Sequence, residues 1–378
     1  MEQPRLTSRL TDFFLELCAI PSPSGEERAV ADRVTRELDA IGLAWDEDDS
    51  GPGIGASAGN VLCRLPGRGE NGGTPMFLCA HFDTVPLAGE LEPVVGEDEI
   101  VRNAGGTILG ADNKSAIVVM VEAARRIVEE GRPHAGVELL FTPMEEIGLV
   151  GANAFDIGRL EAQLGYVYDQ AAPIGDVITG SPTAQELVLT FVGRAAHAGM
   201  YPEEGRSAIV AAARAITDMP HGRLDDVTTV NVGVISGGTA RNVVPERCTV
   251  QAEVRSHRDA RVTEVVQQII DASAFAAALS DCTLETRIDP KYRGYRFRED
   301  DVAIRLAVDA LERTGHPARL GLSGGAADAN VFNARGLPCV NLANGMTDIH
   351  TADERIAVAD LERMVDVTLA LVDVAREA

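Results

Sequence analysis

A chain of 378 residues exceeds the size at which one hydrophobic core keeps growing, so its length predicts two domains. The formal net charge of −24 argues against binding to nucleic acid or to an anionic membrane. The N-terminal sequence Met-Glu-Gln-Pro-Arg-Leu has no signal-peptide hydrophobic region, and no stretch approaches the roughly 18 apolar residues of a membrane span. The cysteines form no Cys-x-x-Cys pair and are expected to be buried free thiols. We therefore expect a cytoplasmic protein.

The N-terminal segment predicts two amphipathic helices. The first has apolar residues on one helical face between Leu10 and Leu17. Ser24 and Glu27 have the spacing of a capping box and predict the start of the second helix. The acidic run 46–49 lies beside a glycine-rich stretch and is interpreted as a solvated loop.

From Asn60 onward, strand patterns alternate with helix patterns. This alternation of strands and helices predicts a mixed, largely parallel sheet with helices on both faces. The predicted strands are 61–65, 76–80, 137–141 and 166–168, with a hairpin at 94–95 and 100–101 and a helix at 114–129.

After Asp169 the order of elements changes to strand, helix, strand, strand, helix, strand, which is typical of a ferredoxin-like α+β domain. The strands are 186–192, 228–235, 248–255 and 283–288, and the helices are 207–217 and 262–277. Beyond Tyr292 the α/β pattern resumes, with helices at 302–313, 326–333 and 360–375 and strands at 319–322 and 338–342. We therefore predict a discontinuous α/β domain, residues 1–179 and 292–378, with an inserted domain at 180–291.

Several predicted strands end in groups that can bind a metal ion. The strand 76–80 leads into His81 and Asp83, which share one face in an extended chain because they are two residues apart. Four further apolar runs, 108–112, 137–146, 164–169 and 340–350, also end in a carboxylate or a histidine. An oxygen-rich set with two histidines indicates a divalent-metal site at the end of the sheet.

The motifs and their order resemble those of the dizinc exopeptidases and amidohydrolases, which include peptidase T, glutamate carboxypeptidase, acetylornithine deacetylase, succinyl-diaminopimelate desuccinylase and aminoacylase. The similarity runs nearly end to end. The motifs that carry it are His-Phe-Asp at 81–83, Gly-Ala-Asp-Asn-Lys at 110–114, Glu-Glu at 145–146, Asp169 and Ile-His-Thr at 349–351.

The resemblance implies two zinc ions per subunit, with Co²⁺ or Mn²⁺ as alternatives. It implies that His81 and Asp169 bind one ion, that Glu146 and His350 bind the other, and that Asp112 bridges them. It also implies a cis peptide bond after the bridging aspartate.

Two further acidic residues have implied roles beside the metals. Asp83 would orient the ring of His81. Glu145 would act as the general base, taking a proton from water and giving it to the leaving amine.

The inserted domain contains a histidine, His197, at the family position that reaches the partner subunit's site and stabilises the oxyanion. This implies a homodimer formed through the inserted domain, whereas the alternative is an ordinary turn histidine. The implied substrate-binding residues are Asn242, Arg255, Gly324 and Gly325, for which a surface strand charge and plain turn glycines are the alternatives. Ala327 stands where peptidase T-like relatives usually carry a hydroxyl residue.

The resulting hypothesis is a metal-dependent tripeptide aminopeptidase that cleaves the amide bond of a small peptide. The alternatives are an N-acyl amino acid deacylase of the same family and a non-catalytic metal- and peptide-binding homologue. A magnesium site for phosphoryl groups is disfavoured by the two histidines and by the absence of a phosphate-binding sequence motif. The other histidines, His134, His221, His257 and His316, are interpreted as surface residues.

Overall fold

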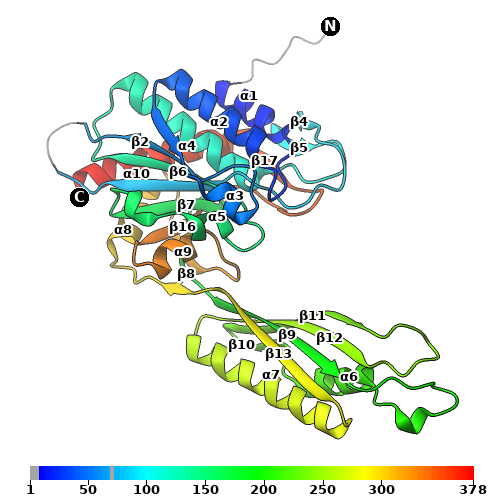
Figure 1. Ribbon diagram of the computed structural model, residues 1–378. Helices are drawn as coiled ribbons and strands as arrows, with labels where there is room; N and C mark the ends of the chain where they lie inside the picture. Colours follow the sequence, from blue (N-terminus) through cyan, green and yellow to red (C-terminus); the bar gives the residue numbers. More distant parts are fainter. Residues whose placement is uncertain (1–7, 69–71) are drawn as a thin grey trace. The chain divides into compact units, whose positions relative to one another are not determined.

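The computed structural model describes residues 8–68 and 72–378, so the N-terminal sequence searched for a signal peptide lies outside the described residues. The chain forms two compact units, which are described separately (Figure 1). The first unit contains the residues up to Thr179 together with Arg296–Ser323 and Ala327–Ala378. The second contains Gly180–Tyr295 and the short segment Gly324–Ala326.

The first unit is built on a mixed sheet whose central strands β6, β3, β7 and β16 run parallel, with antiparallel pairs on either side. The sheet order among the described residues is β1-β2-β6-β3-β7-β16-β8-β14, and β15 pairs with β8. These strands are β1 (Ala44–Glu47), β2 (Val61–Leu65), β3 (Met76–His81), β6 (Val137–Thr142), β7 (Leu164–Gln170), β8 (Asp176–Ser181), β14 (Tyr295–Arg296), β15 (Arg319–Leu322) and β16 (Cys339–Ala343). A separate small sheet joins β4 (Pro93–Val95), β5 (Ile100–Asn103) and β17 (Arg355–Ala357).

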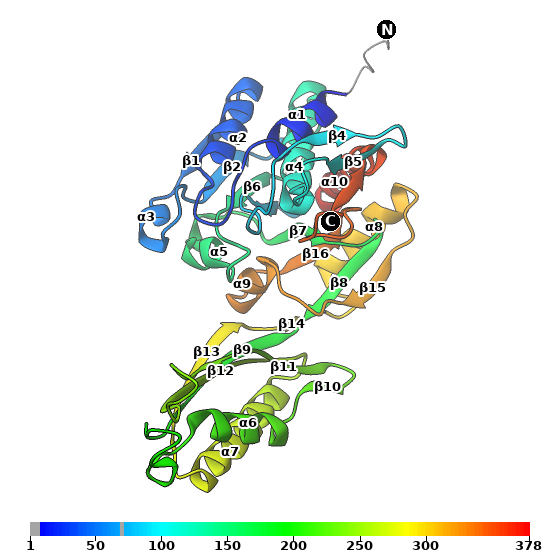
Figure 2. The same cartoon turned by 90° about the vertical axis from the view of Figure 1, so that its right-hand side faces the viewer.

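Helices cover both faces of the large sheet, with α1, α2 and α4 on one side and α5 and α9 on the other (Figures 1 and 2). The helices of this unit are α1 (Arg9–Cys18), α2 (Arg28–Ile41), α3 (Ser50–Ile54), α4 (Ala111–Glu130), α5 (Val150–Ala154), the 3-10 turn η1 (Ile157–Arg159), α8 (Val302–Arg313), α9 (Ala329–Ala334) and α10 (Val358–Glu377). The predicted fold class is confirmed.

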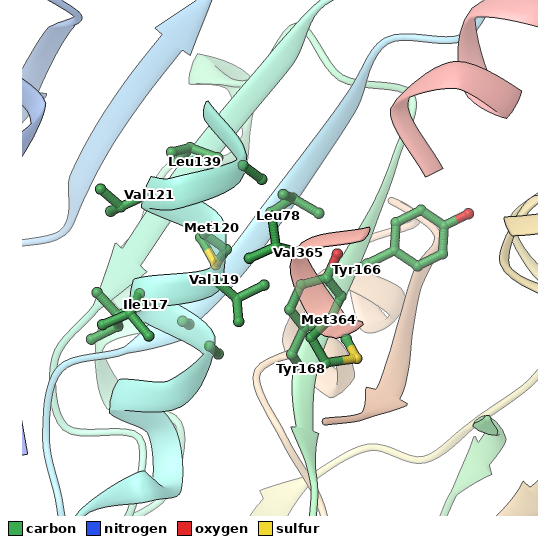
Figure 3. Packing of buried hydrophobic residues seen from close by; sticks show 14 of the residues in the cluster. Leu78, Ile117, Val119, Met120, Val121, Leu139, Tyr166, Tyr168, Met364 and Val365 are labelled. Atoms are coloured by element: carbon green, nitrogen blue, oxygen red, sulfur yellow. The ribbon is translucent and has the colours of Figure 1, made fainter. Parts of the chain in front are cut away.

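Helix α4 occupies the middle of the first unit's core. Its residues from 115 to 124 are all buried, and it packs against strands β3 and β7 and helix α10. Figure 3 shows Leu78 of β3 and Tyr166 of β7 among the side chains of α4 and α10. Strand β3 is buried along its whole length, as expected for a parallel strand covered on both faces.

The second unit is an antiparallel sheet in the order β10-β11-β12-β9-β13, with helices α6 and α7 on one face (Figure 2). Apart from the edge strand β10, this is the order of a ferredoxin-like sandwich. Its elements are β9 (Thr183–Val192), the 3-10 turn η2 (Pro202–Glu204), α6 (Ala208–Asp218), β10 (Gly222–Asp225), β11 (Thr228–Gly237), β12 (Arg247–Ser256), α7 (Asp259–Leu279) and β13 (Thr283–Tyr292).

Several expectations at the ends of elements were wrong. Helix α2 begins at Arg28 without a side-chain cap, because Ser24 hydrogen-bonds to Asp83 and the Glu27 carboxylate accepts from Gly25. The acidic run is not a solvated loop, since its first two residues lie in β1 and Asp48 accepts hydrogen bonds from Asn60. Helix α9 begins at Ala329, three residues later than expected, and Asp328 precedes it as the N-cap residue, with its carboxylate accepting a hydrogen bond from Thr142.

One expectation about exposure was also wrong. His134 is buried, where its backbone pairs with Arg68. Helix α7 is long and apolar enough, by length and composition alone, to cross a membrane, but charged and amide residues interrupt its apolar sequence. Its buried residues pack against the sheet of the second unit, and core helices of soluble proteins have the same composition. All six cysteines are free and five are buried, as predicted.

We predict that Leu78→Ala will lower the free energy of unfolding by about 2–5 kcal/mol, because it removes buried methyl groups and leaves a cavity beside α4. Urea unfolding followed by circular dichroism measures the change. Val94→Ala, at an exposed site on β4, is the control and should change the stability by less than about 0.5 kcal/mol. Equal effects of the two substitutions would contradict this description of the core.

Candidate metal centre

The predicted metal ligands lie at or just beyond the carboxyl ends of the parallel strands. His81 is the last residue of β3, and Asp169 is near the end of β7. Glu146 follows β6, and His350 follows β16. Parallel strands present their carboxyl ends at one edge of the sheet, and for this reason residues far apart in the sequence meet there.

The first potential ligand group contains His81, Asp112 and Asp169. One candidate ligand atom from each residue lies within 4.8 Å of the others. The Nε2 atom of His81 is 3.2 Å from Oδ1 of Asp112 and 3.9 Å from Oδ1 of Asp169. All three side chains are at most 8% exposed, so an ion bound here would be shielded from solvent.

The second potential ligand group contains Asp112, Glu146 and His350. The Nε2 atom of His350 is 3.2 Å from Oδ2 of Asp112 and 3.1 Å from Oε1 of Glu146. Asp112 therefore offers a different oxygen to each group. Imidazole nitrogens and carboxylate oxygens are the ligands of catalytic zinc sites, so these residues fit two metal ions that share one carboxylate.

Asp83 connects His81 to the loop that carries the two glutamates. Its backbone carbonyl lies 2.9 Å from Nδ1 of His81. Its carboxylate accepts the backbone N–H of Glu145 at 2.9 Å and of Glu146 at 3.2 Å, and the hydroxyl of Ser24 at 2.6 Å. Asp83 is thus placed to orient both the imidazole and the Glu145–Glu146 backbone.

Backbone geometry at the start of α4 directs Asp112 into the site. The peptide bond between Asp112 and Asn113 is cis, as the family resemblance implied. The side-chain amide of Asn113 donates to the carbonyl of Tyr168 at 2.7 Å. Asn341 holds the neighbouring strand end, because its side chain accepts from the backbone N–H of Asp169 and donates to the Asp169 carbonyl.

Burial and hydrogen bonding shift the pKa values of the ligand groups in opposite directions. Burial opposes ionisation of Asp112, but hydrogen bonds from His350 and His81 outweigh it and lower the pKa of Asp112. The pKa of Asp169 is raised by burial and by the adjacent charge of Asp112. Hydrogen bonds to Asp112 and Glu146 raise the pKa of His350 to about 10. The metal-free site therefore holds protons that a bound cation would displace.

Glu145 differs from its neighbours in having no place in either ligand group. Its side chain is 8% exposed. Burial raises the pKa of Glu145 well above its ordinary value, and the charges of Asp328 and Glu146 raise it further while His81 opposes them. A buried carboxylate with a raised proton affinity beside a metal site is suited to proton transfer.

Sequence reasoning missed Asp328, which lies close enough to act electrostatically on Glu145. It accepts a hydrogen bond from the Thr142 hydroxyl at the end of β6. Burial raises the pKa of Asp328 to about 6. The sequence signal was the glycine-rich loop just before it, which was interpreted in terms of its glycines and Ala327 but not of Asp328.

The remaining predicted residues belong to the second unit. Nδ1 of His197 accepts the backbone N–H groups of Gly199 at 3.2 Å and Met200 at 3.1 Å, which leaves the proton of a neutral ring on Nε2. Asn242 lies in the adjacent loop, where its carbonyl accepts from the N–H of Ala198.

Arg255 is already engaged by protein partners. Its guanidinium donates twice to Glu253, and Nη1 donates to the carbonyl of Gly324 at 3.1 Å. The carbonyl of Gly325 accepts from the Ser181 hydroxyl. The structure therefore brings Arg255 and the Gly324–Gly325 loop together in the second unit.

Comparison with known proteins identifies the family. Residues 179–278 match the model of the peptidase dimerisation domain, and residues 60–163 match the model of peptidase family M28. The chain is 36% identical over 365 residues to the protein YqjE of Bacillus subtilis (strain 168), covering 97% of this chain and 98% of the relative.

Two solved structures resemble nearly the whole chain. One is aminopeptidase PepT from Bacillus cereus ATCC 10987, with 35% identity, a TM-score of 0.89 and 97% of each chain covered. The other is a tripeptidase from Staphylococcus aureus subsp. aureus Mu50, with 31% identity, a TM-score of 0.93 and 98% of each chain covered. The chain belongs to the peptidase T-like members of the M20 family. This M20 peptidase is accordingly a hydrolytic exopeptidase, as the sequence predicted.

We predict that the unfolding free energy of the chelator-treated M20 peptidase will decline with pH through the titration of His350. Its pKa is raised from an ordinary 6.5 to about 10. The stabilising contacts of the protonated ring are therefore fully present below about pH 6.5 and are lost as the pH rises through about 10. Urea unfolding at a series of pH values, compared with His350→Gln, measures this loss.

The matched control is His316→Gln, which replaces a histidine beyond α8. It should leave the pH dependence of the parent protein unchanged. Parallel stability curves for the parent and His350→Gln would contradict the predicted contribution of His350.

Proposed function

We propose that this peptidase is a two-metal tripeptide aminopeptidase. The observation that carries the proposal is the position of Asp112, whose two oxygens each face a histidine in a separate ligand group. A carboxylate shared in this way suits a pair of divalent cations. The similar solved structures of an aminopeptidase and a tripeptidase support the choice of substrate.

We propose that the metal is zinc, with Co²⁺ and Mn²⁺ as alternatives. His81 and Asp169 would hold one ion, Glu146 and His350 the other, and Asp112 both. The bound ions would polarise the scissile carbonyl and make water a better nucleophile near neutral pH. Asp83 would keep the His81 ring in the orientation that its backbone and side-chain contacts define.

Glu145 would accept the proton of the attacking water and pass it to the leaving amine. Its raised proton affinity fits this role, since a base must hold the proton long enough to deliver it. The backbone N–H of Glu145 donates a hydrogen bond to Asp83, and this contact positions the backbone from which the Glu145 side chain extends.

His197 would donate its Nε2 proton to the developing oxyanion, because Nδ1 is occupied as an acceptor. In this proposal it acts in the site of a partner subunit in a homodimer formed through the inserted domain, residues 180–291. The match to a peptidase dimerisation domain supports that assembly. The catalytic domain would comprise residues 1–179 and 292–378, and the protein would act in the cytoplasm.

Asn242, Arg255, Gly324 and Gly325 are proposed to bind the peptide. Arg255 holds Glu253 and Gly324, so a substrate carboxylate would have to share or displace one of these contacts. The glycines leave the backbone open to close approach by a ligand.

We predict that zinc-restored protein will release the N-terminal residue from tripeptides and that Glu145→Gln will lower kcat by about 10²–10⁴-fold without loss of metal. Tripeptides, N-acetyl amino acids and N-succinyl amino acids are assayed side by side, with metal content measured on the same samples. Glu26→Gln removes an exposed negative charge and is the control.

Deacylation of N-acyl amino acids without tripeptide cleavage would identify the protein as a deacylase that uses the same proposed mechanism. No turnover of any substrate by protein with two metals bound would favour a binding protein. Full activity of Glu145→Gln would exclude Glu145 as the base.

A second prediction tests the homodimer. Glu145→Gln and His197→Ala are each expected to be nearly inactive as pure homodimers. If His197 acts in the partner's site, a mixed dimer contains one site with both residues intact. Co-expression with two different affinity tags, followed by purification of the mixed dimer, should therefore recover up to about half of the parent activity per dimer. Recovery no greater than the average of the two inactive homodimers would contradict action across the dimer.

A further inference from the structure

Glu354 is a buried carboxylate that lies outside both ligand groups. Only 1% of the surface of Glu354 is exposed to solvent. Oε2 accepts the backbone N–H of Gly110 at 2.8 Å, and Oε1 accepts the backbone N–H of Asp112 at 2.9 Å. Both carboxylate oxygens thus accept hydrogen bonds from the loop that carries Asp112.

The same segment carries His350. Residues 347 and 355 exchange both backbone hydrogen bonds, and the N–H of Glu354 donates to the carbonyl of Thr351 at 3.2 Å. An ion pair between Arg355 and Asp348 closes the turn from the outside. His350 and Glu354 therefore sit on one short turn that is hydrogen-bonded to itself, and Glu354 joins this turn to the Asp112 loop.

Burial of a charged carboxylate has a large free-energy cost. A buried carboxylate such as that of Glu354 is therefore expected to have hydrogen-bond or charged partners that offset this cost. The charge of buried Lys114 acts on Glu354, and the Lys114 ammonium itself donates to the carbonyl of Ile20 at 2.7 Å. This charge helps Glu354 to remain buried. It does not account for the two backbone contacts, which need an acceptor at each end of the carboxylate.

We propose that Glu354 is a positioning residue that fixes Asp112 relative to His350 and so controls metal binding by the group Asp112, Glu146 and His350. In that group Glu354 positions two of the three ligands, Asp112 and His350. In the group of His81, Asp112 and Asp169 it positions only Asp112. The inference rests on the proposed two-metal function. It adds that the binding of the two metal ions depends on Glu354 to different degrees.

The test is Zn²⁺ binding by chelator-stripped full-length protein, measured against a competing chelator. Glu354→Gln keeps the shape of the side chain but turns one acceptor into an NH₂ group that faces a backbone N–H. The first equivalent of Zn²⁺ should bind nearly as in the parent, and the second should bind about 10–100-fold more weakly. Titration with Co²⁺ gives an independent optical signal for each equivalent.

Asp353→Asn is the matched control, because it removes an exposed charge from the same turn. It should bind both equivalents as the parent does. Glu354→Asp retains two acceptors on a shorter side chain and should show a smaller weakening of the second equivalent, which keeps the test decisive if Glu354→Gln does not fold. Urea unfolding of the metal-free variants separates a change in site geometry from a general loss of stability.

Parent-like binding of both equivalents by the folded Glu354 variants would overturn the inference. Equal weakening of both equivalents, in step with lower metal-free stability, would also overturn it and would leave Glu354 as a structural residue. A parent protein that binds two ions but cleaves no peptide would overturn the proposed function instead, since the metal titration is read without any substrate.

Discussion

The carboxylate of Asp112 lies between two imidazoles, and much of the first unit serves to keep it there. The backbone N–H of Asp112 is held by Glu354, and the side chain of the next residue, Asn113, is held by the end of β7. A carboxylate can face two cations only if its rotation is restricted, because either group alone could draw it away from the other. The buried helix α4 provides the rigid support, since Asp112 stands at its beginning.

A second constraint is the concentration of negative charge. Asp83, Asp112, Glu145, Asp169 and Asp328 are all largely buried near one another, and the charge of His81 acts to lower the pKa of each of them. Burial raises the pKa values of Glu145, Asp169 and Asp328, and the charges of neighbouring carboxylates raise them further. A site of this kind gains stability from bound cations. Its composition is thus easier to explain by metal binding than by folding alone.

The sequence predicted the parts of this arrangement that depend on local pattern. Each expected ligand follows an apolar strand or opens a helix, so the strand pattern placed it at one edge of the sheet, and the structure brings those residues together in two groups. The sequence also predicted the sandwich order of the inserted unit, apart from the edge strand β10, because turn residues separate its apolar segments. Ser24 was misinterpreted because a hydroxyl three residues before a glutamate looks the same whether it caps a helix or supports an aspartate 59 residues away.

Asn113, Asn341, Asp328 and Glu354 were missed for the same physical reason. Their hydrogen-bond partners lie at least 55 residues away, and a single polar side chain gives no local sign of such a partner. The start of α9 was predicted three residues too early, because Ala326 and Ala327 favour helix by composition although the structure leaves them outside it. Local periodicity determines elements, whereas the supports of a site are set by contacts across the fold.

The order of the ligands along the chain has a consequence for how the protein is made. His81, Asp112 and Asp169 all precede the inserted unit, whereas His350 follows it, and so does Glu354. A chain emerging from the ribosome therefore presents one complete ligand group before the inserted unit has been synthesised. The other group must wait until almost the last residues have been added. The two metal ions of the proposed site would therefore not have to be acquired together, because the nascent chain holds one ligand group while about half of the protein is still to be synthesised.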